Sequence, residues 1–256
     1  MRIYESGYSD HFDGPGTRLI FYLKGCNFRC GWCGAPESLT AETELLRYPD
    51  RTVTAGRDIA PEEILRKAEA ARDFISGVTF GGGEPTLQSD ELLETLNLLR
   101  TAKIHTALES NASTVCYPAA AAAVDWLYSD LKTLNPEKFR NMIHADPSLL
   151  VRVRENLKFA AANHPCFTVR IPVVAGVNDA PEERSQLAGF LTELLALRPE
   201  GELKVELLRQ HRLAAPKYRA LGRKWEFETV EPPPRERLSE FAEELRYHHL
   251  NVTLFG

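Results

Sequence analysis

The sequence predicts an α/β protein whose parallel strands form a partial, splayed (β/α)6 barrel. Two observations support this fold: short apolar or β-branched runs alternate with amphipathic helical patterns, and glycine or charged residues follow most of those runs. The length of 256 residues suits an α/β barrel, and an apolar content of 43% is enough for a sizeable core. We therefore expect a single domain over residues 1–256, with a core at roughly 16–212 and a C-terminal helix and strand at 213–256.

The predicted strands are Leu19–Leu23, Gly77–Phe80, His105–Leu108, Trp126–Tyr128, Phe167–Val174, Leu203–Leu208 and, last in the chain, Asn251–Phe255. Helical patterns begin where proline and early acidic residues suit a helix N-terminus, at Pro61, Asn135–Glu137, Asp146–Pro147 and Asp179–Glu183, and Ala119–Ala123 is a further helix. About six strands before the final helix are too few to close an eight-stranded barrel. We expect an open side that admits a large substrate, with the chemistry at the C-terminal ends of the strands.

The charge pattern excludes several classes of function. The net charge is −5, and Lys and Arg are interspersed with acids, which argues against a nucleic-acid surface. No run of about 18 apolar residues occurs, so a membrane span is not expected. Residues 1–6 lack the apolar stretch of a secretory signal, and five cysteines do not resemble a disulfide framework. We therefore expect a cytoplasmic protein.

Three cysteines lie in one short loop after the first predicted strand. Cys26, Cys30 and Cys33 are separated by three and then two residues. Three thiolates suit an iron–sulfur cluster that needs four ligands and so leaves one iron open for chemistry. The alternative is a structural zinc site, which normally takes four protein ligands in paired spacings, and the chain offers no second pair. Cys116 and Cys166 stand alone, and we interpret each as a small buried apolar residue.

Residues that suit binding or catalysis recur at the ends of the predicted strands. Besides the cysteine loop they are Gly81–Gly83 with Glu84, Glu109, Asp130 with Lys132, Arg170 and His211. Each has a plain structural alternative: the glycines can form a turn, the acids can cap helices, the lysine and the histidine can lie at the surface, and the arginine can be a paired structural residue. Trp32 is either core or a ring that stacks on adenine. Because these residues recur at one rim of the barrel, we expect one site.

Together these motifs resemble the radical S-adenosylmethionine superfamily. The Cys-x3-Cys-x2-Cys loop with an aromatic residue before its last cysteine resembles the superfamily's signature, and Gly82–Pro85 resembles its glycine-rich motif. Tyr4–Ser6 and Asp13–Arg18 resemble the start of glycyl-radical-enzyme activating enzymes, the pyruvate formate-lyase activating type among them. Further similar segments, which extend the resemblance over nearly the whole chain, are Asp130–Lys132, Arg170 with Val173–Asn178, Glu206–His211, and Lys217 and Tyr218 with the proline run.

The resemblance implies one 4Fe-4S cluster, held by Cys26, Cys30 and Cys33, whose fourth iron binds S-adenosylmethionine. Reductive cleavage of this cofactor yields a 5′-deoxyadenosyl radical that abstracts a hydrogen atom. For the methionine end of the cofactor, the resemblance implies backbone contact with the amino group by Gly81, Gly82, Gly83 and Glu84, a nearby negative charge from Glu109, and neutralisation of the carboxylate by Lys132. For the nucleoside, it implies that Asp130 contacts the ribose or a monovalent cation and that His211 and Trp32 bracket the adenosine. Arg170, Asp13 and the Asp13–Arg18 loop would grip the substrate.

Three features depart from the activating enzymes. Gly34 and Ala35 stand where many carry His-Asn, Glu109 replaces an aspartate, and residues 34–80 contain no cysteine, so we expect one cluster. The implied substrate is a glycine of a partner glycyl radical enzyme, with a flavodoxin- or ferredoxin-type electron donor. The alternative, which the Gly34–Ala35 departure favours, is direct action on a small metabolite or peptide. A non-catalytic metal scaffold is a third interpretation, and the charged rim argues against it.

Overall fold

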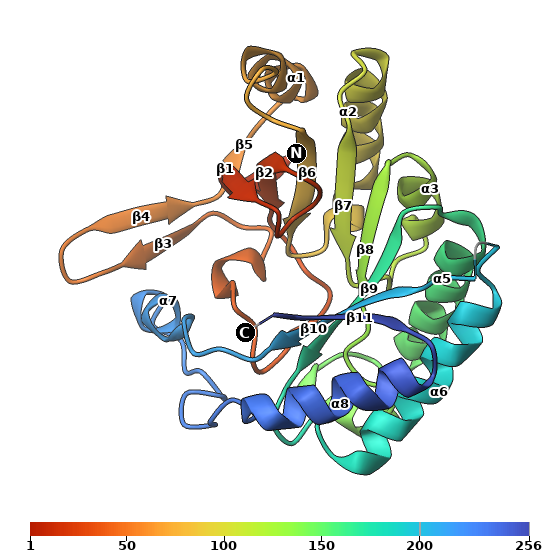
Figure 1. Ribbon diagram of the computed structural model, residues 1–256. Helices are drawn as coiled ribbons and strands as arrows, with labels where there is room; N and C mark the ends of the chain where they lie inside the picture. The colour runs from red at the N-terminus through yellow and green to blue at the C-terminus, as the bar shows by residue number, and fades with distance from the viewer. Residues whose placement is uncertain (200, 256) are drawn as a thin grey trace.

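The computed structural model describes residues 1–199 and 201–255, and its main feature is one curved, mostly parallel sheet (Figure 1). Its nine strands follow the order β11-β10-β9-β8-β7-β6-β2-β1-β5. The strands are β1 (Arg2–Asp10), β2 (Thr17–Leu23), β5 (Arg57–Asp58), β6 (Gly77–Gly82), β7 (Thr106–Ser110), β8 (Trp126–Asp130), β9 (Phe167–Val173), β10 (Lys204–Arg209) and β11 (Asn251–Phe255). Neighbours from β2 to β11 pair in parallel, whereas β1 pairs antiparallel with β2 and β5. The sheet ends at β5 and β11 without closing, which confirms the predicted splayed barrel.

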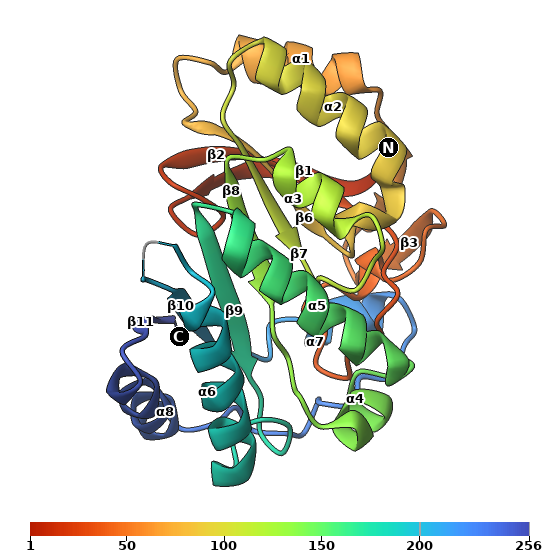
Figure 2. The same ribbon diagram turned by 90° about the vertical axis from the view of Figure 1, so that its right-hand side faces the viewer.

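Helices cover the outer face of the sheet, because each parallel connection must cross back over it (Figure 2). They are α1 (Pro61–Ala70), α2 (Ser89–Thr101), α3 (Tyr117–Ala122), α4 (Pro136–Met142), α5 (Ser148–Asn163), α6 (Pro181–Ala196), α7 (Ala215–Ala220) and α8 (Arg235–Tyr247), with the 3-10 turns η1 (Pro36–Ser38) and η2 (Pro85–Gln88). Within the part of the chain that the structure describes, no helix has both the length and the apolar character needed to cross a bilayer.

Most of the predicted start signals mark helix N-termini. Proline occupies the first helical position of α1, α4 and α6, where no N–H is needed. Asn135 caps α4, because its side-chain oxygen accepts hydrogen bonds from the N–H groups of Glu137 at 3.0 Å and Lys138 at 3.2 Å. Helix α6 differs in one detail: Ala180 rather than Asp179 is its N-cap residue, and no side chain caps it.

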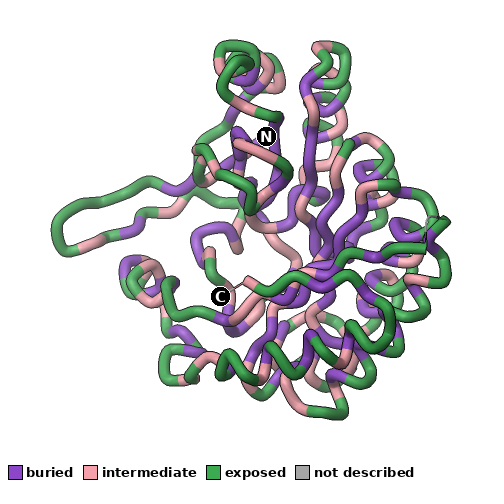
Figure 3. Tube along the Cα trace, viewed as in Figure 1, coloured by how far each residue is buried: buried purple, intermediate pink, exposed green. Residues whose placement is uncertain are grey.

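The strands at the centre of the sheet carry the core, which is visible as a continuous buried zone in Figure 3. Leu127, Val169, Ile171 and Leu207 are completely inaccessible to solvent. Burying a side chain of this size stabilises the fold by about 1.5–3 kcal/mol. Near-continuous apolar runs are typical of parallel strands covered on both faces, and this is why the sequence patterns identified these strands.

Arg18 is part of this core and not of a surface that a substrate reaches. The side chain is fully buried. Its guanidinium donates to Thr79 Oγ1 at 3.0 Å and to the carbonyl of Val78 at 2.7 Å, and it lies 3.1 Å from His105 Nδ1. We expected Arg18 to grip the substrate as part of the Asp13–Arg18 loop, but it instead joins β2 to β6 and to His105, the residue before β7. A buried guanidinium needs such acceptors because its desolvation is costly.

Several elements have no counterpart in the predicted ones, among them helix α2 and the short strand β5. Strand β1 was not predicted, and neither was the hairpin of β3 (Glu44–Arg47) and β4 (Thr52–Ala55). The hairpin projects from the body of the protein and is largely exposed (Figures 1 and 3). Both segments lack a strong apolar alternation because they bury few side chains, and without it no period-2 pattern arises.

The C-terminal segment packs beside the cysteine loop. Helix α7 contacts η1 and β3, and α8 lies along β10 and β11. Between these helices Phe227 meets Trp32 edge-on at a ring distance of 5.9 Å, and Trp225 stacks on Tyr218 at 5.4 Å. The segment therefore covers one flank of the loop with aromatic rings, each pair adding about 0.5–1.5 kcal/mol.

Candidate active site

The cysteine loop begins where β2 ends, and backbone hydrogen bonds fix both of its halves. Gly25 has a φ of 90°, a conformation that favours glycine, and its N–H donates to the carbonyl of Ser38 at 2.7 Å. Farther along, the N–H of Arg29 donates to the carbonyl of Ile143 at 2.9 Å. The loop is thus held by η1 on one side and by the end of α4 on the other.

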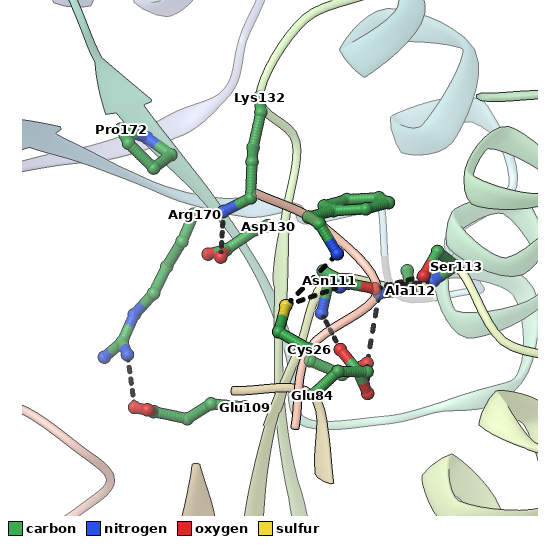
Figure 4. A network of polar contacts seen from close by, with 12 residues as sticks. Cys26, Glu84, Glu109, Asn111, Ala112, Ser113, Asp130, Lys132, Arg170 and Pro172 are labelled. Atoms are coloured by element: carbon green, nitrogen blue, oxygen red, sulfur yellow. Dashed lines mark hydrogen bonds and ion pairs between the residues drawn. The ribbon is translucent and has the colours of Figure 1, made fainter. Parts of the chain in front are cut away.

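The three loop cysteines are free thiols with raised pKa values. Burial raises the pKa of Cys26 to about 12 and also raises the pKa values of Cys30 and Cys33. A buried thiol with a raised pKa loses its proton when a metal binds to its sulfur. Cys26 Sγ accepts a hydrogen bond from the N–H of Phe28 at 3.4 Å and lies 3.8 Å from Asn111 Nδ2 (Figure 4). Amide donors aimed at sulfur tune cluster ligands, so this donor set fits an iron–sulfur cluster.

In residues 1–199 and 201–255, no three His, Cys, Asp or Glu side chains converge closely enough to share one metal ion. A 4Fe-4S cluster binds each thiolate to a different iron and does not require such convergence.

The glycine motif lies where two stretches of backbone nearly touch. Strand β6 continues through Gly81 and Gly82, so the expectation that these residues follow the strand was wrong. A Cβ at Gly82 would lie 2.5 Å from the backbone nitrogen of Leu23, and a Cβ at Gly83 would lie 2.1 Å from the carbonyl oxygen of Gly25. Only glycine permits this approach, which brings the motif against the start of the cysteine loop.

Glu84 is fully buried and its carboxylate is used inside the protein. It accepts hydrogen bonds from the N–H of Thr86 at 3.1 Å, from Ser110 Oγ at 2.8 Å and from the N–H of Asn111 at 2.6 Å (Figure 4). Burial raises the pKa of Glu84, and these hydrogen bonds oppose the rise. The carboxylate therefore joins η2 to the end of β7.

Asp130 and Lys132 form an ion pair beside the thiols. Asp130 is the last residue of β8 rather than part of a following loop, and Lys132 Nζ donates to its Oδ2 at 2.6 Å (Figure 4). Burial by itself would lower the pKa of Lys132, but the charge of Asp130 and its hydrogen bond to Lys132 oppose burial and raise the pKa. Lys132 is therefore a persistent cation close to the cysteine loop.

Arg170 lies within β9 and has acceptors for all three of its guanidinium nitrogens. Its Nη1 donates to Glu109 Oε1 at 2.5 Å, its Nε donates to Glu206 Oε2 at 2.7 Å, and its Nη2 donates to the carbonyl of Phe12. The guanidinium carbon also lies 3.7 Å from the centre of the Tyr128 ring. Burial opposes the charge of Arg170, but the two glutamates outweigh it and raise its pKa.

Glu109 is the acid of this group whose pKa is raised. It is the fourth residue of β7, so our expectation that it follows the strand was also wrong. Burial raises the pKa of Glu109 to about 8; Arg170 opposes the rise, and the nearby Asp13 adds to it. One guanidinium cannot neutralise Glu206, Glu109 and Asp13 together, so one carboxyl group retains its proton more readily than usual.

Half of the predicted site residues line one cavity of 640 Å³. The predicted residues that line it are Cys33, Gly82, Gly83, Glu109, Asp130, Arg170 and His211. The predicted residues that lie outside its lining are Cys26, Cys30, Trp32, Gly81, Glu84, Lys132 and Asp13. Trp32 is buried against Phe227, which corresponds to the core alternative for this ring.

Several cavity residues carry no role in the sequence analysis. Tyr4, from the unpredicted β1, stacks on Tyr22 with ring centres 5.6 Å apart, and both rings line the cavity. Lys217, in α7, lines it as well and is ion-paired with the buried Glu37. The only sequence signal for these residues was that Tyr4 and Lys217 belong to segments similar to activating enzymes.

Comparison with known proteins identifies the family of this chain. The model of the Radical SAM superfamily (SAM, S-adenosylmethionine) matches residues 20–188. An isethionate sulfite-lyase activating enzyme from Oleidesulfovibrio alaskensis is 30% identical over 84% of this chain and 85% of that protein. The benzylsuccinate synthase activating enzyme of Thauera aromatica is 28% identical over 95% of this chain and 89% of that protein. A pyruvate formate-lyase-activating enzyme from Streptococcus mutans is 28% identical over 88% and 83% respectively.

Two solved structures share the fold. A domain of pyruvate-formate lyase-activating enzyme from Bacteroides vulgatus aligns with a TM-score of 0.56 and 24% identity, covering 71% of this chain and 100% of that one. QueE from Escherichia coli aligns with a TM-score of 0.56 and 15% identity, covering 99% and 93%. The region matched by the superfamily model, residues 20–188, contains the three cysteines, the glycine motif and Arg170. The chain therefore belongs to the Radical SAM superfamily, whose enzymes bind a 4Fe-4S cluster and S-adenosylmethionine.

Proposed function

We propose that this enzyme uses S-adenosylmethionine to abstract a hydrogen atom from a glycine of a partner glycyl radical enzyme. The observation that carries the proposal is that proteins similar to 84–95% of this chain are activating enzymes. Such similarity extends beyond the cofactor site to the segments that surround the cavity. The open side of the barrel supports the same conclusion, because a loop of another protein needs a wide entrance.

The chain's own residues hold and orient the reactants. Cys26, Cys30 and Cys33 would each bind one iron of the cluster, which when bound supplies the electron that cleaves the cofactor. Lys132 would bind the methionine carboxylate, because it is a buried cation close to the cysteine loop. The Gly82–Gly83 backbone would lie against the methionine amino end, since no Cβ intervenes there.

The remaining roles concern the nucleoside, the substrate and the electron. His211 lines the cavity and would contact the adenosine, and Arg170 and Asp13 would position the substrate. Reductive cleavage of S-adenosylmethionine takes a single electron, so we propose a one-electron donor of the flavodoxin or ferredoxin type in the cytoplasm. A monovalent cation at Asp130 would compete with Lys132, which already pairs with that carboxylate at 2.6 Å.

One observation supports direct action on a small metabolite or peptide as a second candidate. Gly34 and Ala35 line the cavity, and their small side chains leave more of it free than His-Asn at these positions would. A small substrate could occupy that space. A bulky side chain at either position would fill it.

The experiment is anaerobic reconstitution with iron and sulfide, followed by a low-potential reductant, S-adenosylmethionine and a purified glycyl radical enzyme from the same organism. The expected result is 5′-deoxyadenosine together with a glycyl doublet in the EPR spectrum of the partner. Cys30→Ala should abolish both products, whereas Cys116→Ala, the matched control outside the loop, should retain them. Deoxyadenosine formation that is driven by a small molecule, without any protein radical, would instead establish the second candidate.

A further inference from the structure

We propose that the free edge of β1 is a docking strand for the protein substrate, whose glycine-bearing segment adds to the sheet as an extended β-strand. This inference rests on the proposed function and adds to it the conformation of the substrate and the surface that binds it. Four observations support it: an unpaired edge, its position along the cavity, the direction of its backbone groups, and an exposed aromatic pair beside it.

The outer edge of β1 is unpaired over most of its length. Strand β5 covers only Arg2 and Ile3, and no other described strand pairs with β1 apart from β2. From Glu5 to Asp10 the edge carries no proline and no lysine, the residues that proteins commonly use to block strand addition. An open edge of this kind is a template for another chain.

The hydrogen bonds of β2 determine which residues of β1 face outward. The carbonyls of Thr17 and Leu23 accept from Ser76 and Gly83, so alternate residues of β2 from Thr17 to Leu23 point toward β6. Their partners on β1 therefore have no acceptor or donor in β2. By the observed register these outward-facing residues are Ser6, Tyr8 and Asp10. Their N–H and C=O groups repeat about every 7 Å, which is the spacing that an added strand matches and a small molecule does not.

The edge leads from the surface to the cysteine loop. Residues on both faces of β1, Glu5 and Gly7 on one and Tyr8 on the other, line the 640 Å³ cavity, so the cavity borders the edge itself. At the inner end of the strand, the N–H of Lys24 donates to the carbonyl of Arg2 at 2.9 Å, two residues before the first cysteine. A segment that pairs with Ser6 and Tyr8 would therefore run along the cavity wall toward the loop.

Gly7 and an aromatic pair complete the docking surface. A Cβ built on Gly7 meets no atom within 4 Å, so the cavity is open over the face of β1 at this point. Tyr8 and Phe74 are 59% and 64% exposed, and their rings meet edge-on at 5.2 Å. Exposed aromatic rings beside an unpaired edge provide the apolar contact that backbone pairing alone lacks.

The test uses reconstituted enzyme and two probes: the partner enzyme that acquires the glycyl doublet, and a library of heptapeptides with a central glycine. In hydrogen exchange, the amides of Ser6, Tyr8 and Asp10 should exchange rapidly in the free protein and become protected when a probe binds. Ser6→Pro removes one outward N–H and is tolerated on an edge strand. It should lower the rate of glycyl radical formation about tenfold, the effect of one or two lost backbone hydrogen bonds.

Two controls separate backbone pairing from misfolding and from side-chain effects. Ser6→Ala keeps the N–H and should stay within about twofold of the wild type. Leu254→Pro places the same perturbation on the other open edge, in β11, and should leave activation unchanged. Iron content checks the folding of each variant. Equal activation by Ser6→Pro and Ser6→Ala, or unprotected edge amides with every probe, would overturn the inference. A wild type that activates no partner would refute the proposed function, and the peptide library would still decide whether the edge binds an extended chain.

Discussion

The contact between the glycine motif and the cysteine loop can be tested with one added methyl group. In Gly83→Ala the new Cβ would lie 2.1 Å from the carbonyl oxygen of Gly25, 2.8 Å from its carbonyl carbon and 3.0 Å from the carbonyl oxygen of Ser38. All three are backbone atoms and cannot rotate away. The two backbones must separate by more than about 1 Å to restore van der Waals distance.

The energetic cost follows from the bonds that such a shift breaks. The N–H of Gly83 donates to Leu23 at 2.9 Å, and the N–H of Glu84 donates to Gly25 at 2.8 Å. Losing two backbone hydrogen bonds costs about 2 kcal/mol, and overpacking adds about 1–3 kcal/mol. We expect Gly83→Ala to lower the free energy of unfolding by about 3–5 kcal/mol, a large part of the stability of an ordinary domain.

The assay has two parts and one matched control. Urea unfolding of the metal-free protein measures the loss of stability, and iron per chain after anaerobic reconstitution measures damage to the loop. Gly189→Ala, in the exposed middle of α6, meets no atom within 4 Å and should instead stabilise the protein by about 0.5–1 kcal/mol. If Gly83→Ala reconstitutes to wild-type iron content and unfolds at the same urea concentration, the argument from backbone contact is refuted.

Three further outcomes follow from the charges and thiols. Arg170→Met should lower the free energy of unfolding in urea by about 3–5 kcal/mol, because it leaves buried carboxylates unpaired. Adding Glu109→Gln and Glu206→Gln should recover part of this loss, and no recovery would argue against that cause. Since the pKa of Glu109 is raised to about 8, the folded state keeps a proton that the unfolded state loses, so stability should fall as pH rises from about 4.5 to 8, and Glu109→Gln should flatten this slope. Cys30→Ser should reduce iron content and visible absorbance, whereas Cys166→Ser should leave both unchanged.

The apolar strands and the cysteine loop could be predicted from the sequence because each leaves a local signature. Buried parallel strands read as continuous apolar runs, and the predicted strand Asn251–Phe255 coincides with β11. The strand ends were less predictable. Gly81, Glu109 and Asp130 lie inside strands, because pairing with neighbours extends each strand past its apolar run, and this pairing leaves no trace in a single segment.

Residues whose roles depend on distant partners could not be predicted. Arg18 looks like a loop residue in the sequence, and its burial depends on acceptors at Thr79 and His105, more than 60 positions away. The side chain of Trp32 was ambiguous for the same reason, since only the fold brings Phe227 against it. Strand β1 has too few buried side chains to create an alternation, although it forms one wall of the cavity.

The charges around the cavity are already paired within the protein, and this constrains which ligands the site accepts. Lys132 pairs with Asp130, Lys217 pairs with Glu37, and Arg170 is shared between two glutamates. A ligand of one sign would leave one member of a partly buried pair without its partner, which is unfavourable. A ligand that carries both a positive and a negative group, as S-adenosylmethionine does, offers a partner to each member of such a pair. We therefore propose that the pairing of Lys132 with Asp130 favours a ligand that carries both charges.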